Sequence, residues 1–297
     1  MRCNLCHGES FARLPFHYSW AGKRWQGRRC RSCGLICIDP QPSEDELARL
    51  YAADYFADGL HGLDRAGLDY EALHDADRTA ASRLVETVLR RHHPAAERLF
   101  EIGPAMGHVL DAARRAGLDV GGVEISPTGV ARAREKFGLD LIEGNIEFVD
   151  LSAENGGWDI VYCGDLLEHV RDPLGVVGKA AALLRPGGLC VMRLPGTFNL
   201  LATRLAVPLL LALGRQKQLP DKPYHLYEFT TTTARRLFAR HFDRVEVRNE
   251  AIAPWRLNRK TGSADYLAKY LLQWLNWPLT GLTNRFGDRM TILAYRD

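Results

Sequence analysis

The sequence predicts an α/β fold: a largely parallel sheet with helices on both faces, a small metal-binding module before it, and helical insertions near the C-terminus. Three observations support this fold. Residues 98–126 read as strand, glycine-bearing turn, helix and strand; two CxxC pairs lie near the N-terminus; and apolar stretches follow at 198–219 and 266–277. A chain of 297 residues can hold one α/β domain with a sizeable core and a small appended module.

The first element is the pair of cysteine motifs. Cys3 with Cys6 and Cys30 with Cys33 have the spacing typical of a closed, non-catalytic zinc site. A structural zinc ion contributes about 10–16 kcal/mol of apparent binding energy to folding such a module. Disulfides are the alternative, but seven cysteines is an odd count and the first ten residues lack the apolar core of a signal peptide. We therefore expect zinc and a reducing, cytoplasmic location.

The same region is basic, although the net charge of the whole chain is only +3. Between residues 10 and 38 there is no acid, and the basic residues are Arg13, Lys23, Arg24, Arg28, Arg29 and Arg31. This run predicts a local positive face, suited to a phosphorylated small molecule or to RNA, with a merely solvated basic surface as the alternative.

A connecting segment follows. Ser43 with Glu46 is typical of a helix N-terminus with a capping box, and the helix extends through Tyr51. Residues 56–73 are rich in Gly and Asp and predict a loop or lid. The expected organisation is a zinc-ribbon-like module over 1–40, a linker helix and lid over 41–76, and an α/β domain over 77–297 with insertions at about 197–228 and 251–288.

The α/β domain is expected to open with a helix over 77–92, followed by the strand–turn–helix–strand unit. Leu99, Phe100 and Ile102 predict a buried parallel strand that leads to a turn. Gly103 and Gly107 free the backbone there, so main-chain N–H groups and the next helix can approach a ligand.

The residues around this turn indicate the ligand. A dinucleotide fingerprint requires a small residue at its sixth position, where this chain has His108, so a pyrophosphate is disfavoured. Glu101 places a carboxylate beside the turn, where it could hold an ammonium group. Glu124 ends the next strand, where it could bind a ribose diol. Two acids suit a zwitterionic ligand that carries a ribose.

This segment resembles motif I and the following acidic loop of class I S-adenosylmethionine-dependent methyltransferases, whose pattern (E/D)xGxGxG is met by Glu101, Gly103 and Gly107. Ala105 departs from the pattern at the middle glycine, which puts the loop geometry in doubt more than the cofactor. The resemblance implies a Rossmann-like fold and S-adenosylmethionine as methyl donor.

Later landmarks follow in the family's order. Gly144, Asn145 and Ile146 come where the family contacts adenine, and 158–173 reads as a strand over 159–163 and a polar loop. A helix around 180–184 is expected to end at Arg185-Pro186-Gly187-Gly188, which reverses the chain into a strand over 189–194. The resemblance thus implies cofactor contacts at Glu101, Gly103, Ala105, Gly107, Glu124, Ile125, Asn145, Ile146 and Asp165.

Candidate bases lie on the acceptor side. Methyl transfer needs positioning and, for a hydroxyl or activated carbon, removal of a proton, for which histidine is suited near neutral pH. His169 follows the fourth strand, and His225 precedes a helix expected over 231–241. A structural histidine is the alternative at both positions.

The apolar segments raise the question of a membrane. The run in 198–219 is shorter than the ~20 residues needed to span a bilayer, and Arg204 and Pro208 interrupt it. A second apolar helix over 266–277 precedes the last strand, 290–295. Together they could form a lid, a dimer face or a surface for a lipid-linked acceptor, with core packing as the plain alternative. The oligomeric state stays open.

The acceptor is implied only by resemblance. The segment 33–56 resembles the N-terminal region of bacterial methyltransferases of sugar and surface-glycan biosynthesis. This implies a sugar, nucleotide sugar or glycan precursor, methylated at oxygen or carbon. The alternatives are an RNA methyltransferase that uses the basic zinc module, a methyltransferase of a lipid-linked acceptor, and a non-catalytic protein that binds S-adenosylmethionine.

Overall fold

The structure is a computed structural model that describes residues 1–50, 74–219, 222–256 and 264–297. The chain forms two compact units. Unit 1 comprises Met1–Ala72, Pro195–Ala234 and Arg248–Met290, and unit 2 comprises Leu73–Leu194, Arg235–Val247 and Thr291–Asp297. The lid expected over residues 56–73 lies outside the described residues.

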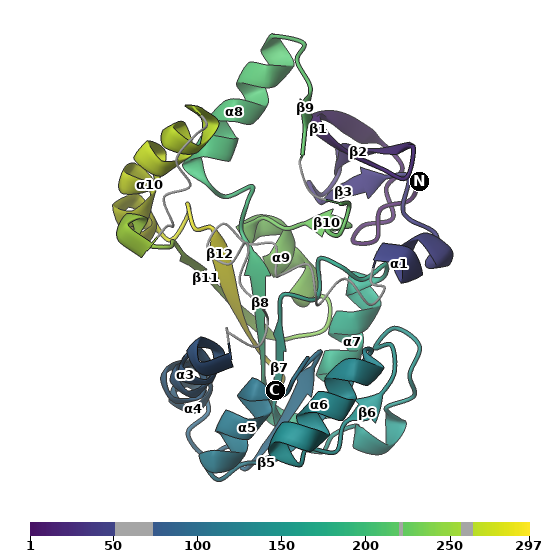
Figure 1. The fold of residues 1–297 in the computed structure, drawn as a ribbon, viewed down its shortest axis with the longest axis vertical. Coiled ribbons are helices and arrows are strands. Elements are labelled where there is room, and N and C mark those ends of the chain that lie inside the picture. Colours follow the sequence, from purple (N-terminus) through teal and green to yellow (C-terminus); the bar gives the residue numbers. More distant parts are fainter. Residues whose placement is uncertain (51–73, 220–221, 257–263) are drawn as a thin grey trace. The chain divides into compact units, whose positions relative to one another are not determined.

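The larger sheet has seven strands in the order β11-β12-β8-β7-β4-β5-β6 (Figure 1). Their bounds are β4 Arg98–Ile102, β5 Asp119–Glu124, β6 Ile142–Glu143, β7 Trp158–Gly164, β8 Leu184–Pro195, β11 Arg244–Glu250 and β12 Arg289–Tyr295. β4 pairs in parallel with β5 and β7, β5 with β6, and β7 with β8. The predicted α/β fold with a largely parallel sheet is confirmed.

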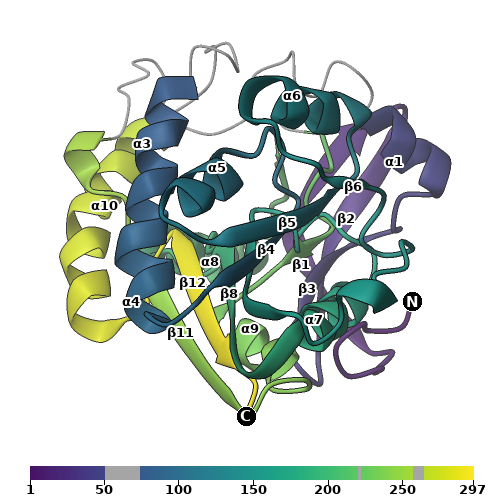
Figure 2. The same ribbon diagram turned by 90° about the horizontal axis from the view of Figure 1, so that it is seen from below.

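Helices cover both faces of this sheet. Figure 2 shows α3, α5 and α6 on one side and α7 on the other. Their bounds are α3 His74–Leu84, α5 His108–Arg115, α6 Pro127–Phe137 and α7 Pro173–Leu183. A π-helical turn, η1 (Val85–Leu89), continues α3 into α4 (Arg90–His92), and a short 3-10 turn, η2, spans Ser152–Glu154. The core between α3, α5 and the sheet includes Leu99, Leu110 and Ile160, all fully buried.

The ends of α6 and α7 follow from their sequences. Ser126 Oγ accepts a hydrogen bond from Gly129 N at 3.1 Å, and Asp172 Oδ1 accepts one from Gly175 N at 3.0 Å. A proline follows each cap, where its missing N–H costs nothing. Gly138 ends α6 with a φ of +61°.

Three elements differ from the sequence-based expectation. β8 already begins at Leu184, so the Arg-Pro-Gly-Gly segment is part of the strand instead of a reversal before it. Gly187 keeps a left-handed φ of +78° there, and its N–H donates to Arg296 O at 2.7 Å. The helix expected over 231–241 is α9, Thr231–Phe238, and the apolar helix expected over 266–277 is the longer α10, Ala264–Thr283.

Unit 1 contains a five-stranded sheet in the order β10-β3-β2-β1-β9. Its strands are β1 Phe11–Trp20, β2 Lys23–Cys30, β3 Ile36–Asp39, β9 Lys217–Gln218 and β10 Tyr227–Glu228. β9 pairs with β1 and β10 pairs with β3. The segment expected as a helical insertion therefore also supplies both edge strands of the N-terminal sheet.

The remaining elements of unit 1 are α1 Glu44–Leu50, α8 Leu201–Ala212, η3 Pro254–Arg256 and α10. The predicted capping box begins α1, since Ser43 N donates to Glu46 Oε2 at 2.9 Å and Glu46 N to Ser43 Oγ at 3.3 Å. α8 contacts α10, yet no residue of α8 is fully buried. Among the described residues, we find no helix with the length and hydropathy required to cross a membrane.

Candidate functional site

The residues predicted to bind the cofactor lie at one edge of the larger sheet. β7, β4, β5 and β6 are neighbours, and the parallel pairing brings their carboxyl ends to the same edge. This is the edge at which open α/β sheets bind ligands. The set comprises Glu101, Gly103, Ala105 and Gly107 at the end of β4, Glu124 and Ile125 after β5, Asn145 and Ile146 after β6, and Asp165 after β7.

The turn between β4 and α5 takes a left-handed backbone at three positions. The φ values are +74° at Gly103, +51° at Ala105 and +84° at Gly107. A Cβ at Gly107 would lie 2.7 Å from Leu139 Cδ1, so both conformation and space require glycine there. Ala105 therefore keeps the backbone conformation of the missing glycine and carries its strain.

Glu124 joins the two loops of the site. Its Oε2 accepts a hydrogen bond from Ala105 N and its Oε1 accepts one from Ser126 N, both at 2.8 Å. Burial raises the pKa of this carboxyl, and the backbone hydrogen bonds partly oppose that rise. Each carboxylate oxygen has a second lone pair, so Glu124 can hold the turn and still accept hydroxyl groups of a ligand.

Glu101 is the least satisfied group at this edge. The side chain is buried, and its Oε2 has no hydrogen-bond partner among the described residues. Burial, and next the nearby Glu124, raise the pKa of Glu101 to about 8. A buried carboxylate without a partner is costly unless a cation or a proton neutralises it. The arrangement fits a ligand that brings an ammonium group to Glu101.

The loop after β6 offers an apolar flank. Ile125 is 60% exposed at the end of β5, while Ile146 is buried. Asn145 Oδ1 accepts a hydrogen bond from Glu147 N at 2.9 Å, so this side chain shapes its own turn. A flat ring system could pack on Ile125.

Lys179 is a site residue that sequence reasoning missed. From α7, its Nζ donates to Ile146 O at 2.8 Å, Glu147 O at 3.1 Å and Val149 O at 2.9 Å. All three protons of the ammonium group are thereby directed at the loop after β6. No motif predicts this role, because the contact joins residues about thirty positions apart.

Asp165 lies after β7 in a strained conformation. Its φ is +52°, its side chain is exposed, and its N–H donates to Arg193 O at 3.0 Å. Aspartate is among the few residues that tolerate a left-handed backbone. The pairing with β8 therefore holds Asp165 at the ligand edge.

The two candidate bases belong to different units. In unit 2, His169 Nε2 lies 3.7 Å from Oε1 of the buried Glu168. In unit 1, His225 Nδ1 lies 3.1 Å from Oε1 of Glu228, which is also buried. A carboxylate on Nδ1 favours the tautomer whose Nε2 carries no proton and can accept one. Sequence reasoning missed Glu228, although its i, i+3 spacing from His225 was visible.

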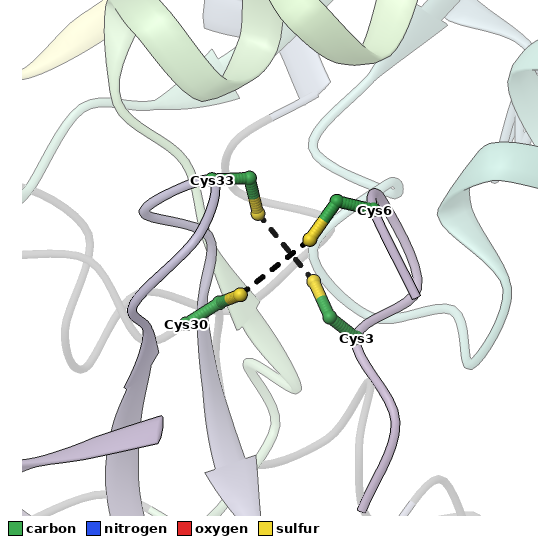
Figure 3. Close-up of side chains that lie close together, drawn as sticks. All are labelled: Cys3, Cys6, Cys30 and Cys33. Atoms are coloured by element: carbon green, nitrogen blue, oxygen red, sulfur yellow. Dashed lines mark hydrogen bonds between the residues drawn. The ribbon is translucent and has the colours of Figure 1, made fainter. Parts of the chain in front are cut away.

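The four cysteines of the CxxC pairs converge in unit 1. Figure 3 shows their sulfur atoms directed toward one centre, with Cys3 Sγ 3.5 Å from Cys33 Sγ and Cys6 Sγ 3.6 Å from Cys30 Sγ. All four are free thiols, and their Sγ atoms lie within 4.8 Å of one another. Zinc–sulfur bonds of about 2.3 Å in a tetrahedron place sulfur atoms about 3.8 Å apart. The cluster therefore has the dimensions of a tetrahedral metal site.

Two residues of the basic run have acidic partners that the local sequence did not reveal. Arg28 Nε lies 3.1 Å from Asp39 Oδ2, and Lys23 forms an ion pair with Glu46. Trp25 is fully buried, so it offers no exposed ring on which a base could stack. The surface that carries uncompensated positive charge is therefore smaller than the sequence predicted.

Comparison with known families and curated proteins gives consistent results. A family model described as "Methyltransferase domain" matches residues 72–243. The ubiquinone biosynthesis O-methyltransferase of Xanthomonas axonopodis pv. citri is 26% identical over 245 residues, which are 77% of this chain and 92% of that protein. Its counterpart in Xanthomonas campestris pv. campestris (strain B100) is 28% identical over 241 residues, with 77% and 92% covered.

Solved structures agree at the level of the fold. A SAM-dependent methyltransferase from Thermotoga maritima matches with a TM-score of 0.50 at 18% identity, over 77% of this chain and 94% of that one. A SAM-dependent methyltransferase from Archaeoglobus fulgidus matches with a TM-score of 0.50 at 18% identity, over 77% and 100%.

Proposed function

Since the chain belongs to the methyltransferase-domain family and is a SAM-dependent methyltransferase, we propose that it methylates an oxygen atom of a small sugar-like acceptor. The observation that supports the donor best is the buried Glu101 Oε2 at the end of β4, which has no partner in the part of the chain that the structure describes. S-adenosylmethionine supplies an electrophilic methyl group on a sulfonium when it is bound at this edge.

The site residues fit the parts of that donor. Glu101 would hold its ammonium group, and a charge-assisted bond would return the raised pKa of this carboxyl toward its ordinary value. Glu124 would accept the ribose hydroxyls while it keeps Ala105 N and Ser126 N. Ile125 would pack on the adenine ring.

Asn145, Ile146 and Asp165 complete the proposed donor contacts. They follow β6 and β7, the neighbours on either side of the strand pair that carries the two glutamates. Lys179 is added as a positioning residue, because it fixes the backbone that carries Ile146.

The class of acceptor rests on two arguments. The resemblance of residues 33–56 favours a sugar, nucleotide sugar or glycan precursor, and the O-methyltransferase names of the relatives favour oxygen over carbon. Ubiquinone biosynthesis is the pathway in those relatives' names. An intermediate of ubiquinone biosynthesis is therefore the second class of acceptor to be tested.

His225 is one candidate base for an acceptor hydroxyl. Glu228 orients its ring and would stabilise the imidazolium that forms when Nε2 takes the proton. His169 is the second candidate, held against Glu168. His225→Asn is expected to lower kcat strongly while leaving the affinity for S-adenosylhomocysteine unchanged. An unchanged kcat would contradict His225 as the base and favour His169.

A structural zinc ion is part of the proposal. Cys3, Cys6, Cys30 and Cys33 supply four sulfur ligands, which makes a closed site with no position for substrate. The ion would replace the hydrophobic core that so small a module cannot build.

Exposed apolar residues on α8, directly after it and on α10 favour a lipid-linked molecule as the acceptor. Leu205, Leu209 and Leu213 are each more than half exposed, as are Leu271 and Leu275 on α10. Such a surface suits contact with a membrane that carries a lipid-linked acceptor. The RNA alternative receives less support, because Arg28 and Lys23 are paired with carboxylates.

The decisive experiment is calorimetric titration of the ligand-free protein with S-adenosylhomocysteine, beside Glu124→Ala and Glu124→Gln. Because Glu124 also holds Ala105 N, the alanine variant loses loop contacts as well as ribose contacts. The glutamine variant keeps one acceptor oxygen and tests the charge. Micromolar binding that both variants weaken supports the assignment, and unchanged affinity in both would refute the role of Glu124.

Absence of binding by the wild-type protein would argue against the proposed donor site as a whole. Binding without turnover on nucleotide sugars, glycan precursors and ubiquinone intermediates would favour the non-catalytic alternative.

A further inference from the structure

One face of the five-stranded sheet in unit 1 is polar, and the aspartate that it carries, Asp39 of β3 opposite Gln26, is paired with Arg28 at 3.1 Å. His17 of β1 lies opposite Gln26 of β2, and Ser19 lies opposite Arg24. Side chains two positions apart on a strand share a face, and directly opposed residues do too, so these four side chains lie on the same side.

A bulge in β1 brings a second arginine to this face. The pairing with β2 shifts register between Arg13 and His17, and Gln26 Nε2 donates to Leu14 O and Phe16 O at 2.7 Å each within the shifted segment. Bulges redirect the side chains next to them. Here Arg13 Nε donates to Gln26 Oε1 at 2.9 Å.

Two guanidinium groups therefore meet at one neutral amide oxygen. Arg24 Nη2 lies 3.4 Å from the same Gln26 Oε1 and 3.4 Å from Gln216 Oε1. In the described part of the chain, no carboxylate forms an ion pair with Arg13 or Arg24. An amide oxygen accepts hydrogen bonds but does not cancel two positive charges, so among the described residues the two arginines have no carboxylate bound to them.

The same face contains a buried histidine that can donate or accept a hydrogen bond. His17 is only 8% exposed, and its Nδ1 has no partner among the residues that the structure describes. Burial, and then the positive charges of Arg24 and Arg13, lower the pKa of His17. A buried ring nitrogen without a partner among the described residues can hydrogen-bond to a ligand.

We infer that Arg13, Arg24 and His17 form a binding site for the phosphoryl group of a small molecule. A phosphate dianion would accept charge-assisted hydrogen bonds from both guanidinium groups. Arginine suits this pairing because its planar guanidinium can donate two parallel N–H bonds to phosphate oxygens. The positive charge is concentrated at one point, which suits a terminal or bridging phosphate of a small ligand better than an extended nucleic-acid backbone. Gln26 Oε1 accepts from both guanidinium groups and so holds them together, while its Nε2 stays bound to Leu14 O and Phe16 O.

If the ligand of this site is the acceptor of the proposed reaction, that acceptor is phosphorylated. Only this part of the inference rests on the proposed function. The phosphoryl group could equally come from free phosphate. The two sources share the same chemistry and differ only in what surrounds the phosphate.

The test uses the full-length protein, titrated by calorimetry with inorganic phosphate and with uridine diphosphate. Arg13→Gln/Arg24→Gln removes both charges, and Arg29→Gln is the matched control, since Arg29 is exposed on the same strand but alternates to the opposite face. We expect the double variant to weaken both affinities about tenfold or more, and the control to leave them unchanged.

Tighter binding of uridine diphosphate than of phosphate would assign the site to a phosphorylated small molecule, and equal affinities would assign it to the free anion. Absence of binding, or an equal loss in the Arg29 control, would overturn the site. Much tighter, salt-sensitive binding of a short RNA would overturn the small-molecule assignment. The affinity for S-adenosylhomocysteine, measured on the same samples, distinguishes failure of this site from failure of the methyltransferase site.

Discussion

Glu101 shows how a single residue prepares a binding site at a cost to the unliganded protein. Its carboxyl is buried near a second carboxyl, Glu124, and Tyr162 is its register partner on the neighbouring strand β7. Water cannot stabilise its charge there, so the protonated form is favoured. For the same reason, a cation that binds beside Glu101 would stabilise the ionised carboxylate.

The first prediction concerns pH and Glu101. The pKa rises from 4.5 to about 8 on folding, so the folded chain holds a proton between these values that the unfolded chain has released. The free energy of unfolding should therefore fall as pH rises from 4.5 to 8, by an amount on the order of a few kcal/mol. Glu101→Gln should flatten this dependence in urea titrations across that range. An equally steep profile in the variant would contradict the assignment.

The second prediction concerns Ala105. A left-handed alanine costs roughly 1–2 kcal/mol, while glycine adds 0.5–1 kcal/mol of backbone entropy, so Ala105→Gly should stabilise the fold by up to about 1 kcal/mol. Ala112→Gly, at a buried helical position of α5, is the matched control and should destabilise. Urea denaturation of both variants checks the opposite signs.

Sequence reasoning succeeded at this scale where the signal was local. The order of Glu101, Gly103 and Gly107 along seven residues is sufficient to place a turn and a carboxylate. It could not show that Ala105 retains the glycine conformation, or that Glu124 holds the amide of Ala105, because the latter contact joins residues nineteen positions apart.

Among the elements, the N-terminal sheet depends most on distant partners. Its edge strands β9 and β10 have only two residues each, too short for any periodicity to predict. They are defined by pairing with β1 and β3. The CxxC spacing, in contrast, predicted the convergence of four sulfur atoms, because two tight turns suffice to bring them together.

The third prediction tests the cysteine cluster as a metal-binding element. The purified protein should contain one zinc ion per chain, and a strong chelator should make the N-terminal module sensitive to protease. Cys3→Ser/Cys33→Ser should lose the metal, measured by elemental analysis. Cys37→Ala, in the same module but outside the cluster, should retain it. Equal protease resistance with and without chelator would count against the metal.

For the whole molecule, the division into two units has a thermodynamic consequence. Each unit is built from three separated stretches of the chain, which no local sequence pattern could reveal. The cysteine cluster belongs to unit 1 and the proposed donor site to unit 2. A ligand of one unit should stabilise mainly that unit.

The fourth prediction follows for calorimetry. Thermal unfolding should show two transitions, of which S-adenosylhomocysteine raises one and a chelator lowers the other. The matched control is Glu124→Gln, in which the first shift should shrink and the second persist. A single transition that both reagents move would mean that the two units unfold as one.

The three hydrogen bonds of Lys179 have a consequence for chemical reactivity. An amine reacts with acylating reagents only through a free lone pair, and here the ammonium is held by the carbonyls of Ile146, Glu147 and Val149. In competitive labelling with acetic anhydride, Lys179 should react far more slowly than the exposed Lys136 on α6. Once acetylated, it would keep a single N–H for three acceptors, so the loop would loosen. A modification on α7, outside the binding edge, would then weaken the protein's affinity for its methyl donor.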